Sequence, residues 1–127
     1  MPRWQAISPT ASSAARGIRF TNHTGFLVTP LDSMFTVWTA VNRTSKSGKV
    51  IGPGEKIPVL QALRAITADA AFQYREEAER GTLEVGKVAD RVLLSQNPLR
   101  VDPQRLREVK VVETVKGGRT VYLRPAR

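Results

Sequence analysis

The chain has 127 residues, 41% of them hydrophobic and 24% charged, as in ordinary soluble globular domains. A complete (β/α)₈ barrel needs about 200 residues, so we expect one small domain or a part of something larger. The absence of cysteine excludes disulfides, Cys-ligated zinc and thiol nucleophiles, and the single His23 excludes a multi-histidine metal cluster from this chain alone. No apolar run reaches the roughly 18 residues of a membrane span and no signal-peptide pattern is present. We therefore expect a cytoplasmic protein with no membrane partner.

The net charge is +9, from 20 Lys and Arg against 11 Asp and Glu, an excess that could attract nucleic acid. The basic residues are dispersed, however, and the densest group, Arg43, Lys46 and Lys49, lies in a Ser- and Gly-rich stretch. There is no Arg-rich helix, zinc finger or aromatic–basic strand pattern. We expect a solvated basic surface, or one that an absent acidic segment covers, and no nucleic-acid partner.

The first part of the chain contains the candidate site. Residues 1–16 are rich in Ser and Ala and poor in long apolar side chains, which predicts a loose lead-in. Residues 17–21 alternate apolar and polar, as in a short strand. Residues 22–25 are turn-forming, and a loop at the carboxyl end of a strand is where α/β enzymes place catalytic groups. His23 is therefore a candidate functional residue.

Two helices are predicted next. The first follows Asp32, whose carboxylate can accept hydrogen bonds from the free N–H groups of the first turn. Its apolar face consists of Met34, Val37, Trp38 and Val41, at positions i, i+3, i+4 and i+7. A loop is predicted over residues 44–54, which contain Ser, Lys and three glycines.

The second helix is predicted over residues 57–74, with Pro58 in its first turn. Its buried stripe consists of Leu60, Leu63, Ile66 and Ala70. The small side chains of residues 67–71 would let another element approach closely. The charged residues 75–80 would finish the helix exposed.

A small β region is predicted after Gly81. Residues 92–94, 109–115 and 119–122 have the composition of short strands. Lys116, Gly117 and Gly118 predict a tight hairpin between the last two, because glycine adopts the positive φ that such turns need.

Residues 81–94, GTLEVGKVADRVLL, carry a recognisable string. It resembles the G-x-[IL]-x-x-G-x-x-A-D-hydrophobic signature of the amidohydrolase superfamily, where the chain returns from the catalytic barrel to a β-sandwich. The two glycines turn the backbone, Ala89 permits close packing, and Asp90 can cap the turn before a buried strand.

Further motifs lie upstream. Residues 22–25 (NHTG) and 28–32 (VTPLD) are similar to the N-H-[ST]-D and V-T-P-L-D segments of the amidohydrolase 3 subgroup, which includes N-substituted formamide deformylases. Residues 38–43 and 62–71 continue the likeness in the same order, so that it extends over residues 12–123.

The resemblance implies an α/β fragment: the last strand and helices of a (β/α)₈ amidohydrolase barrel, followed by part of a small β-sandwich. It divides the chain into a lead-in (1–16), the C-terminal end of the barrel (17–80) and a β-sandwich portion (81–127). In the full-length family, a divalent metal of zinc type activates water, and an Asp after strand 8 acts as general base. The resemblance places the other metal ligands on segments that these residues do not include.

Gly25 stands where the family has this Asp. Glycine offers neither a metal-binding oxygen nor a basic lone pair, and the neighbouring motifs leave no room to shift the alignment. His23 is therefore either a neighbour of a substrate or metal-site water, as the resemblance implies, or an imidazole hydrogen-bonded in a loop with nothing bound. We expect no cofactor or metal to be held by this chain.

Three functions remain open. The chain is an inactive C-terminal fragment of an amidohydrolase, a subunit that completes a barrel encoded elsewhere, or a non-catalytic binding or oligomerisation module. Its helix faces and strands would lack partners within 127 residues. We therefore expect either self-association or association with the missing N-terminal barrel segment.

Overall fold

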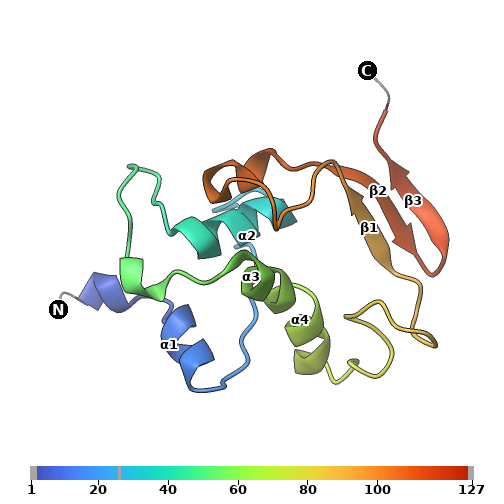
Figure 1. The fold of residues 1–127 in the computed structure, drawn as a ribbon, viewed down its shortest axis with the longest axis horizontal. Helices are drawn as coiled ribbons and strands as arrows, with labels where there is room; N and C mark the ends of the chain where they lie inside the picture. The colour runs from blue at the N-terminus through green and yellow to red at the C-terminus, as the bar shows by residue number, and fades with distance from the viewer. Residues whose placement is uncertain (1–2, 26, 126–127) are drawn as a thin grey trace.

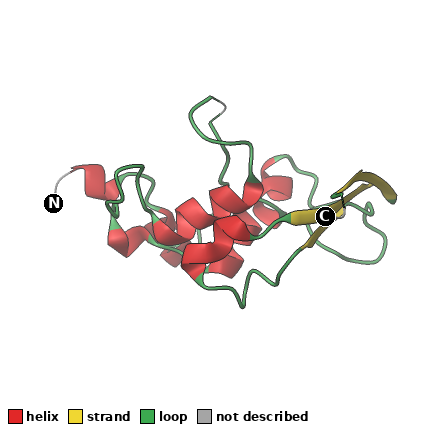
Figure 2. Cartoon of the chain, turned by 90° about the horizontal axis from the view of Figure 1, so that it is seen from above, coloured by secondary structure: helices red, strands yellow, loops and turns green. Residues whose placement is uncertain are grey.

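The computed structural model describes residues 3–25 and 27–125 as a helical half beside a small β-sheet (Figure 1). The elements, in chain order, are η1 (Arg3–Ala6), α1 (Thr10–Ala15), α2 (Ser33–Asn42), η2 (Pro53–Glu55), α3 (Val59–Ala65), α4 (Ala68–Gln73), β1 (Arg91–Leu94), η3 (Pro103–Glu108), β2 (Val111–Lys116) and β3 (Arg119–Leu123), where η denotes a 3₁₀ helix. Figure 2 shows the helices gathered on one side and the strands on the other, with the connection between α1 and α2 projecting from the helical half. Within the described ranges, no helix is long and apolar enough to cross a membrane.

Helix α2 forms the centre of the core. The predicted N-cap is confirmed, because Asp32 Oδ1 accepts hydrogen bonds from the backbone N–H groups of Met34 and Phe35 at 2.8 and 3.1 Å. The predicted apolar face is also buried, but the chain covers it by itself. Leu106 of η3 and the following Val109 are fully buried against it. The core thus crosses residue 80, the boundary implied by the family resemblance.

A hydrogen-bond network fastens η3 to α2. Buried Asn42 donates from Nδ2 to the carbonyl oxygens of Trp38 and Pro103 at 3.0 and 2.8 Å, and accepts from Gln104 Nε2 at 2.6 Å. Trp38 Nε1 donates to the Gln104 carbonyl at 3.0 Å. The polar groups of Asn42 and Trp38 are therefore paired with the connection between β1 and β2.

The prediction of one continuous second helix is wrong. The chain forms two short helices, α3 and α4, with a break at Thr67. The Thr67 hydroxyl donates to the Leu63 carbonyl at 2.8 Å, and the backbone there leaves the helical region at φ −128° and ψ −90°. A side chain that hydrogen-bonds to the residue four positions earlier competes with the helix in this way. The charged stretch after α4 forms turns instead of extending the helix.

The small side chains of α4 do permit a close approach, as predicted. Gly81 lies so near that a Cβ placed on it would be 2.6 Å from Ala71 Cβ and 3.1 Å from Ala68 Cα. Its φ of +94° is also one that residues with side chains rarely adopt. Close contact with α4 and a left-handed turn both require glycine at this position.

Three further expectations are wrong. Leu60, predicted to be buried, is 54% exposed, because α3 contacts its neighbours through Ala62 and Ala65. Residues 10–15 of the lead-in form α1, which is hydrogen-bonded to Glu55. Residues 17–21 form no strand among the described residues: Gly17 lies in a turn with a φ of 70°, and the N–H groups of Gly17 and Ile18 are hydrogen-bonded back to Ala14 and Ser13.

The three strands form an antiparallel meander, β1-β2-β3. Val92 pairs with Thr114, and Glu113 pairs with both Leu93 and Leu123. The predicted hairpin is confirmed: Gly117 and Gly118 adopt φ of 55° and 77°, as in a type I′ turn.

Two residues of the family-like string 81–94, Ala89 and Asp90, are hydrogen-bonded to this turn. Asp90 Oδ1 accepts the Gly117 N–H at 2.7 Å, and the Ala89 carbonyl accepts the Gly118 N–H at 3.0 Å. The Ala-Asp pair is thus a clip on the β2–β3 hairpin, rather than a cap on its own turn as the sequence suggested.

Candidate functional site

The candidate site lies in the connection between α1 and α2, at residues 22–25. The Asn22 N–H donates to the Ala65 carbonyl at the end of α3 at 3.2 Å, and the Thr21 hydroxyl donates to Gln73 Oε1 of α4 at 2.7 Å. Beyond it, the Gly25 carbonyl accepts the N–H groups of Val28 and Thr29 at 2.9 and 3.0 Å, which turns the chain toward α2. Helices α3 and α4 therefore position the loop by backbone and amide contacts.

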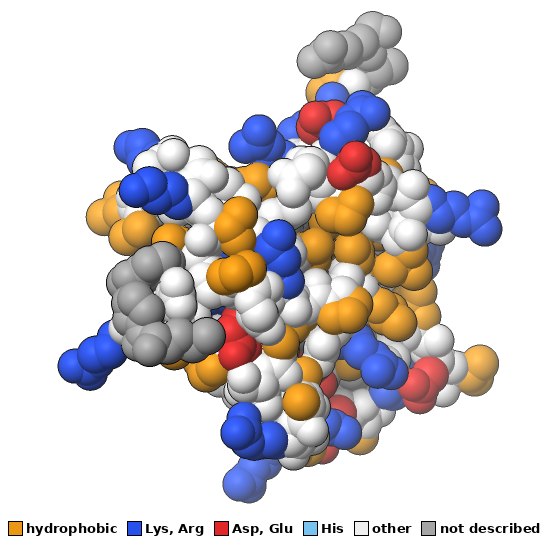
Figure 3. Space-filling view, turned by 60° about the vertical axis from the view of Figure 1, so that its left-hand side comes forward, with side chains coloured by type: hydrophobic (Ala, Val, Ile, Leu, Met, Phe, Trp, Pro, Cys, Tyr) orange, Lys and Arg blue, Asp and Glu red, His pale blue; other side chains and the backbone are white. Residues whose placement is uncertain are grey.

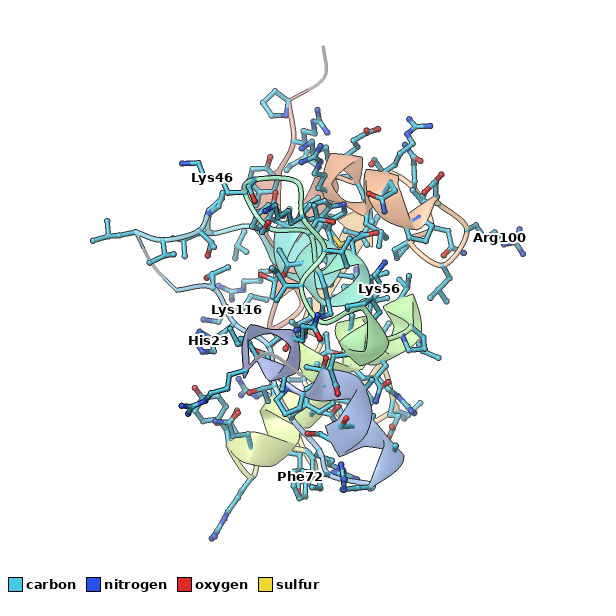
Figure 4. The ribbon with its side chains drawn as sticks, turned by 90° about the vertical axis from the view of Figure 1, so that its left-hand side faces the viewer. His23, Lys46, Lys56, Phe72, Arg100 and Lys116 are labelled. Carbon is cyan, nitrogen blue, oxygen red and sulfur yellow. The ribbon has the colours of Figure 1, made fainter. Side chains whose placement is uncertain are left out.

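His23 is exposed on the outside of the helical half (Figure 4). Its Nδ1 lies 3.1 Å from the carbonyl oxygen of the adjacent Thr24. A carbonyl can only accept, so as a hydrogen bond this contact requires the proton on Nδ1. The geometry is that of an imidazole hydrogen-bonded within its own loop.

Two hollows of about 330 Å³ each adjoin His23. Both are lined by Thr10, Asn22 and His23, and one extends to the hydroxyls of Thr36 and Thr39 on α2. None of the residues lining either hollow carries a carboxylate. The hydrogen bond of His23 goes to the Thr24 carbonyl, so among the described residues no carboxylate orients the ring, and none of the nearby hydroxyls is bonded to it as an activated nucleophile would be.

Gly25 is not required by the backbone. Its φ lies outside the left-handed region, and a Cβ placed on it would meet only Val28 Cβ, at the ordinary contact distance of 3.8 Å. A Cβ would therefore fit at this position without a clash, so neither the backbone conformation nor close packing dictates glycine here.

Arg43 lines the hollow that extends to Thr36 and Thr39, a role that the sequence did not reveal. Its guanidinium donates to three backbone carbonyls: Ile51 at 2.7 Å, Ser8 at 3.1 Å, and Ile7. These bonds hold the N-terminal segment against the end of α2. The residue looked like part of a solvated basic loop, and no local pattern indicates such long-range partners.

Glu55 is a second residue that the sequence did not single out. Its carboxylate accepts the Ser12 N–H at 2.9 Å and the Ser12 hydroxyl, and its carbonyl accepts the Thr10 hydroxyl at 2.7 Å. The Ser12 hydroxyl bond, followed by the backbone bond, lowers the pKa of Glu55 below its ordinary value. The carboxylate thus holds α1 in place and is not free for chemistry.

The described residues do not fit a divalent metal. Within residues 3–25 and 27–125, no three His, Cys, Asp or Glu side chains come close enough to hold one ion. Asp32, the carboxylate nearest in sequence to Gly25, is occupied as the cap of α2. A metal site would therefore need ligands from another polypeptide segment.

Comparison with known proteins identifies the family. The model of the amidohydrolase family matches residues 1–122. The chain belongs to the amidohydrolase family. Among curated relatives of this amidohydrolase chain, the N-substituted formamide deformylase of Arthrobacter pascens is 30% identical over 121 residues, 93% of this chain and 22% of its own length. The putative amidohydrolase YtcJ of Bacillus subtilis strain 168 is 31% identical over 98 residues, 75% of this chain and 18% of its own length.

Solved structures agree in fold. An amidohydrolase from Thermotoga maritima superposes with a TM-score of 0.66 at 22% identity, covering 91% of this chain and 26% of its own. An uncharacterized protein gives a TM-score of 0.55 at 23% identity, covering 87% of this chain and 25% of its own. The chain thus spans about a fifth of the length of its curated relatives and about a quarter of these structures.

Proposed function

We propose that the chain is the C-terminal part of a metal-dependent amidohydrolase and does not hydrolyse amides by itself. In this proposal, residues 17–80 correspond to the last barrel strand and its helices, and residues 81–127 to part of a β-sandwich. The observation that carries the proposal is a difference in length. The family model matches nearly all of this chain, residues 1–122, whereas the chain aligns with only 22% of the deformylase.

The chemistry of the complete enzyme is the hydrolysis of a non-peptide C–N bond. The Arthrobacter relative is named for N-substituted formamides, which makes these the first substrate class to test. Such hydrolysis needs a metal-activated water and a base that takes its proton. In this chain Gly25 offers no base, and His23 lies beside it without a carboxylate partner.

The test is metal binding and turnover by the whole chain. After loading with Zn²⁺ and dialysis against a weak chelator, we expect substoichiometric zinc by elemental analysis. We also expect no hydrolysis of N-substituted formamides or N-acyl amino acids, with or without metal. The matched control is His23→Ala: turnover that survives repurification but disappears in this variant would contradict the proposal, as would one retained zinc per chain.

For the isolated chain we propose self-association through the sheet. Strands β1 and β3 are the outer strands of β1-β2-β3, and Val121 and Leu123 of β3 are exposed. Open edges with apolar side chains favour pairing between copies. Analytical ultracentrifugation over a tenfold concentration range should reveal dimers or larger species, whereas one monomeric species throughout would contradict this.

A further inference from the structure

A hollow of about 530 Å³ lies between α4 and the start of β1, beside the connection that joins them (Figure 1). Residues of α4, of the connection 74–90 and of β1 all line it. We call it the α4–β1 hollow and define it by six of these residues: Ala70, Ala71, Leu83, Val88, Arg91 and Val92. Its volume falls in the range of about 300–1,000 Å³ in which proteins bind small organic ligands.

The wall formed by the connection is held in place by bonds within the connection itself. Lys87 Nζ donates to the Glu77 carbonyl at 2.7 Å and to the Thr82 hydroxyl at 2.6 Å, and its side chain is only 14% exposed. The Val88 N–H donates to the Glu79 carbonyl at 2.8 Å. A ligand would therefore meet a wall that is already formed, so that little binding free energy is lost in ordering it.

The lining of the α4–β1 hollow is mainly apolar. Leu83 and Val92 are 79% and 54% exposed, so much of their apolar area is in contact with water. The small side chains of Ala70 and Ala71 leave space between them and these residues. Tyr74 also lines the hollow and is 73% exposed, so its ring can stack on an aromatic ligand. Covering this surface with the apolar body of a ligand is favourable, because it removes apolar area from water.

Two basic and two acidic side chains line the hollow, and they differ in how far they are already paired. Glu76 pairs with Arg80 at 3.3 Å, and Asp90 Oδ1 accepts the Gly117 N–H at 2.7 Å. Arg91 is exposed and has no ion pair within residues 3–25 and 27–125. The net charge of +9 also attracts anions, and basic side chains are spread over the face in Figure 3 with fewer acidic ones. Arg91 is therefore the cation available to a ligand, and its guanidinium can hold a carboxylate through two parallel hydrogen bonds.

We propose that the α4–β1 hollow binds a small aromatic carboxylate, with the ring beside Leu83 and Val92 and the carboxylate on Arg91. The proposal goes beyond the proposed function and does not depend on it, because it concerns binding alone and uses no residue of the loop around His23. The ligand touches both the helical half and the sheet. Its binding therefore stabilises the folded arrangement in which the two are packed together.

The probe is 3-phenylpropionate, and 3-phenylpropanol and 3-phenylpropylamine are ligands of similar shape that are neutral and positively charged. Titrated into the full chain and followed by NMR, the carboxylate should bind saturably at one site and shift amide resonances of both α4 and β1. The alcohol should bind about threefold to fivefold more weakly, because an exposed ion pair contributes little more than that, and the amine more weakly still. Saturating carboxylate should also raise the midpoint of thermal unfolding.

Two variants test the placement of the ligand, each with a matched control. Leu83→Ala is compared with Val85→Ala, because both residues are exposed in the same connection and Val85 does not line the hollow. Arg91→Gln is compared with Arg119→Gln, because each arginine is the exposed first residue of a strand and Arg119 lies outside the hollow. Leu83→Ala should weaken carboxylate and alcohol alike by about fivefold, and Arg91→Gln the carboxylate alone by about threefold to fivefold. The controls should change either affinity less than about twofold.

The absence of saturable binding, or shifts confined to residues outside α4, β1 and their connection, would overturn the proposal. An alcohol or amine that binds as tightly as the carboxylate would do the same, as would equal losses in the variants and their controls. Sedimentation that slows in Leu83→Ala but not in Val85→Ala would assign the hollow to a second copy of the chain and would also overturn it. The zinc and turnover tests do not bear on these outcomes, so the two proposals fail separately.

Discussion

The helical half and the sheet are stabilised by different means. Around α2, the side chains of Val37, Leu106 and Val109 are removed from water almost completely. In the sheet, every residue of β3 is exposed, and Val115 is the one strand residue of the described ranges that is buried. The helical half therefore depends on burial of apolar area, whereas the sheet depends on its hydrogen-bond ladder and on the contacts that fix its turn.

The largest effect should come from the residue that joins the two regions. Leu106 belongs to the connection between β1 and β2, yet it is fully buried against α2. Leu106→Ala should lower the free energy of unfolding by about 2–5 kcal/mol, because it leaves a cavity that a close-packed core fills poorly. Leu99→Ala, at a half-exposed position of the same connection, should cost less than about 1 kcal/mol in urea denaturation. Equal effects would show that η3 is not part of the core.

Gly81 and Gly86 allow the cost of close packing to be separated from the cost of backbone strain. Both have φ near +90°, but only Gly81 is pressed against α4, while nothing lies within 4 Å of the Cβ position at Gly86. Gly86→Ala should cost about 1–2 kcal/mol for the left-handed backbone. Gly81→Ala should cost a further 1–3 kcal/mol or so for the clash with Ala71. Thermal melts of the two variants give the difference directly.

The clip on the hairpin should show a smaller, local effect. Asp90→Ala removes the acceptor for the Gly117 N–H, at a cost of about 1 kcal/mol. Amide hydrogen exchange at Gly117 should accelerate, while exchange in α2 should not. Asp90→Asn retains an acceptor oxygen at the same place, so its exchange rate at Gly117 should lie between those of Asp90→Ala and the native chain. Faster exchange throughout α2 would mean that the sheet and the helical half are coupled more tightly than their contacts suggest.

The last prediction concerns pH and the helical half alone. The pKa of Glu55 is lowered in the folded chain by its bonds from Ser12, so its contribution to stability is present above the unfolded-state pKa and is lost as pH falls through the folded value. The Ser12 amide resonance should therefore shift in acid as α1 loosens. Glu55→Gln should remove this dependence.

Glu84 provides the control for the pH experiment. Its pKa is also lowered, first by the Thr82 hydroxyl and then by Lys87, and both of these residues belong to the loop before β1 and not to α1. Glu84→Gln should leave the acid transition of Ser12 unchanged. A transition that persists in Glu55→Gln and disappears in Glu84→Gln would contradict the role of Glu55.

Short-range features were predictable and long-range ones were not. The cap at Asp32 and the turn at Gly117 follow from chemistry within a few residues, and both are confirmed. The exposure of Leu60 and the burial of α2 by η3 depend on residues far away in the chain, which periodicity does not report. The break at Thr67 is local, but it comes from a hydrogen bond between side chain and backbone that hydrophobic periodicity does not report either. Residues 17–21 are the clearest case: their pattern is that of a strand, but among the described residues no strand pairs with them and Gly17 lies in a turn.

The same division holds for the candidate site. The recognised motifs directed attention to the loop around His23 and predicted the loss of a carboxylate at Gly25, and membership of the amidohydrolase family is confirmed. The roles of His23 and Gly25 remain predictions. The sequence did not reveal Arg43 and Glu55, because their partners, Ile51 and Ser12 among them, are brought together only by the fold.

The network of Asn42, Trp38 and Gln104 has a practical consequence for limited proteolysis. A protease that nicks the exposed loop of residues 82–86 cuts the covalent link between the helical half and the sheet. The connection between β1 and β2 would still be anchored to α2 by Leu106 and by this network. The two peptides should therefore elute together under native conditions and separate only in denaturant. Cleavage of the polypeptide in this loop should leave one folded unit.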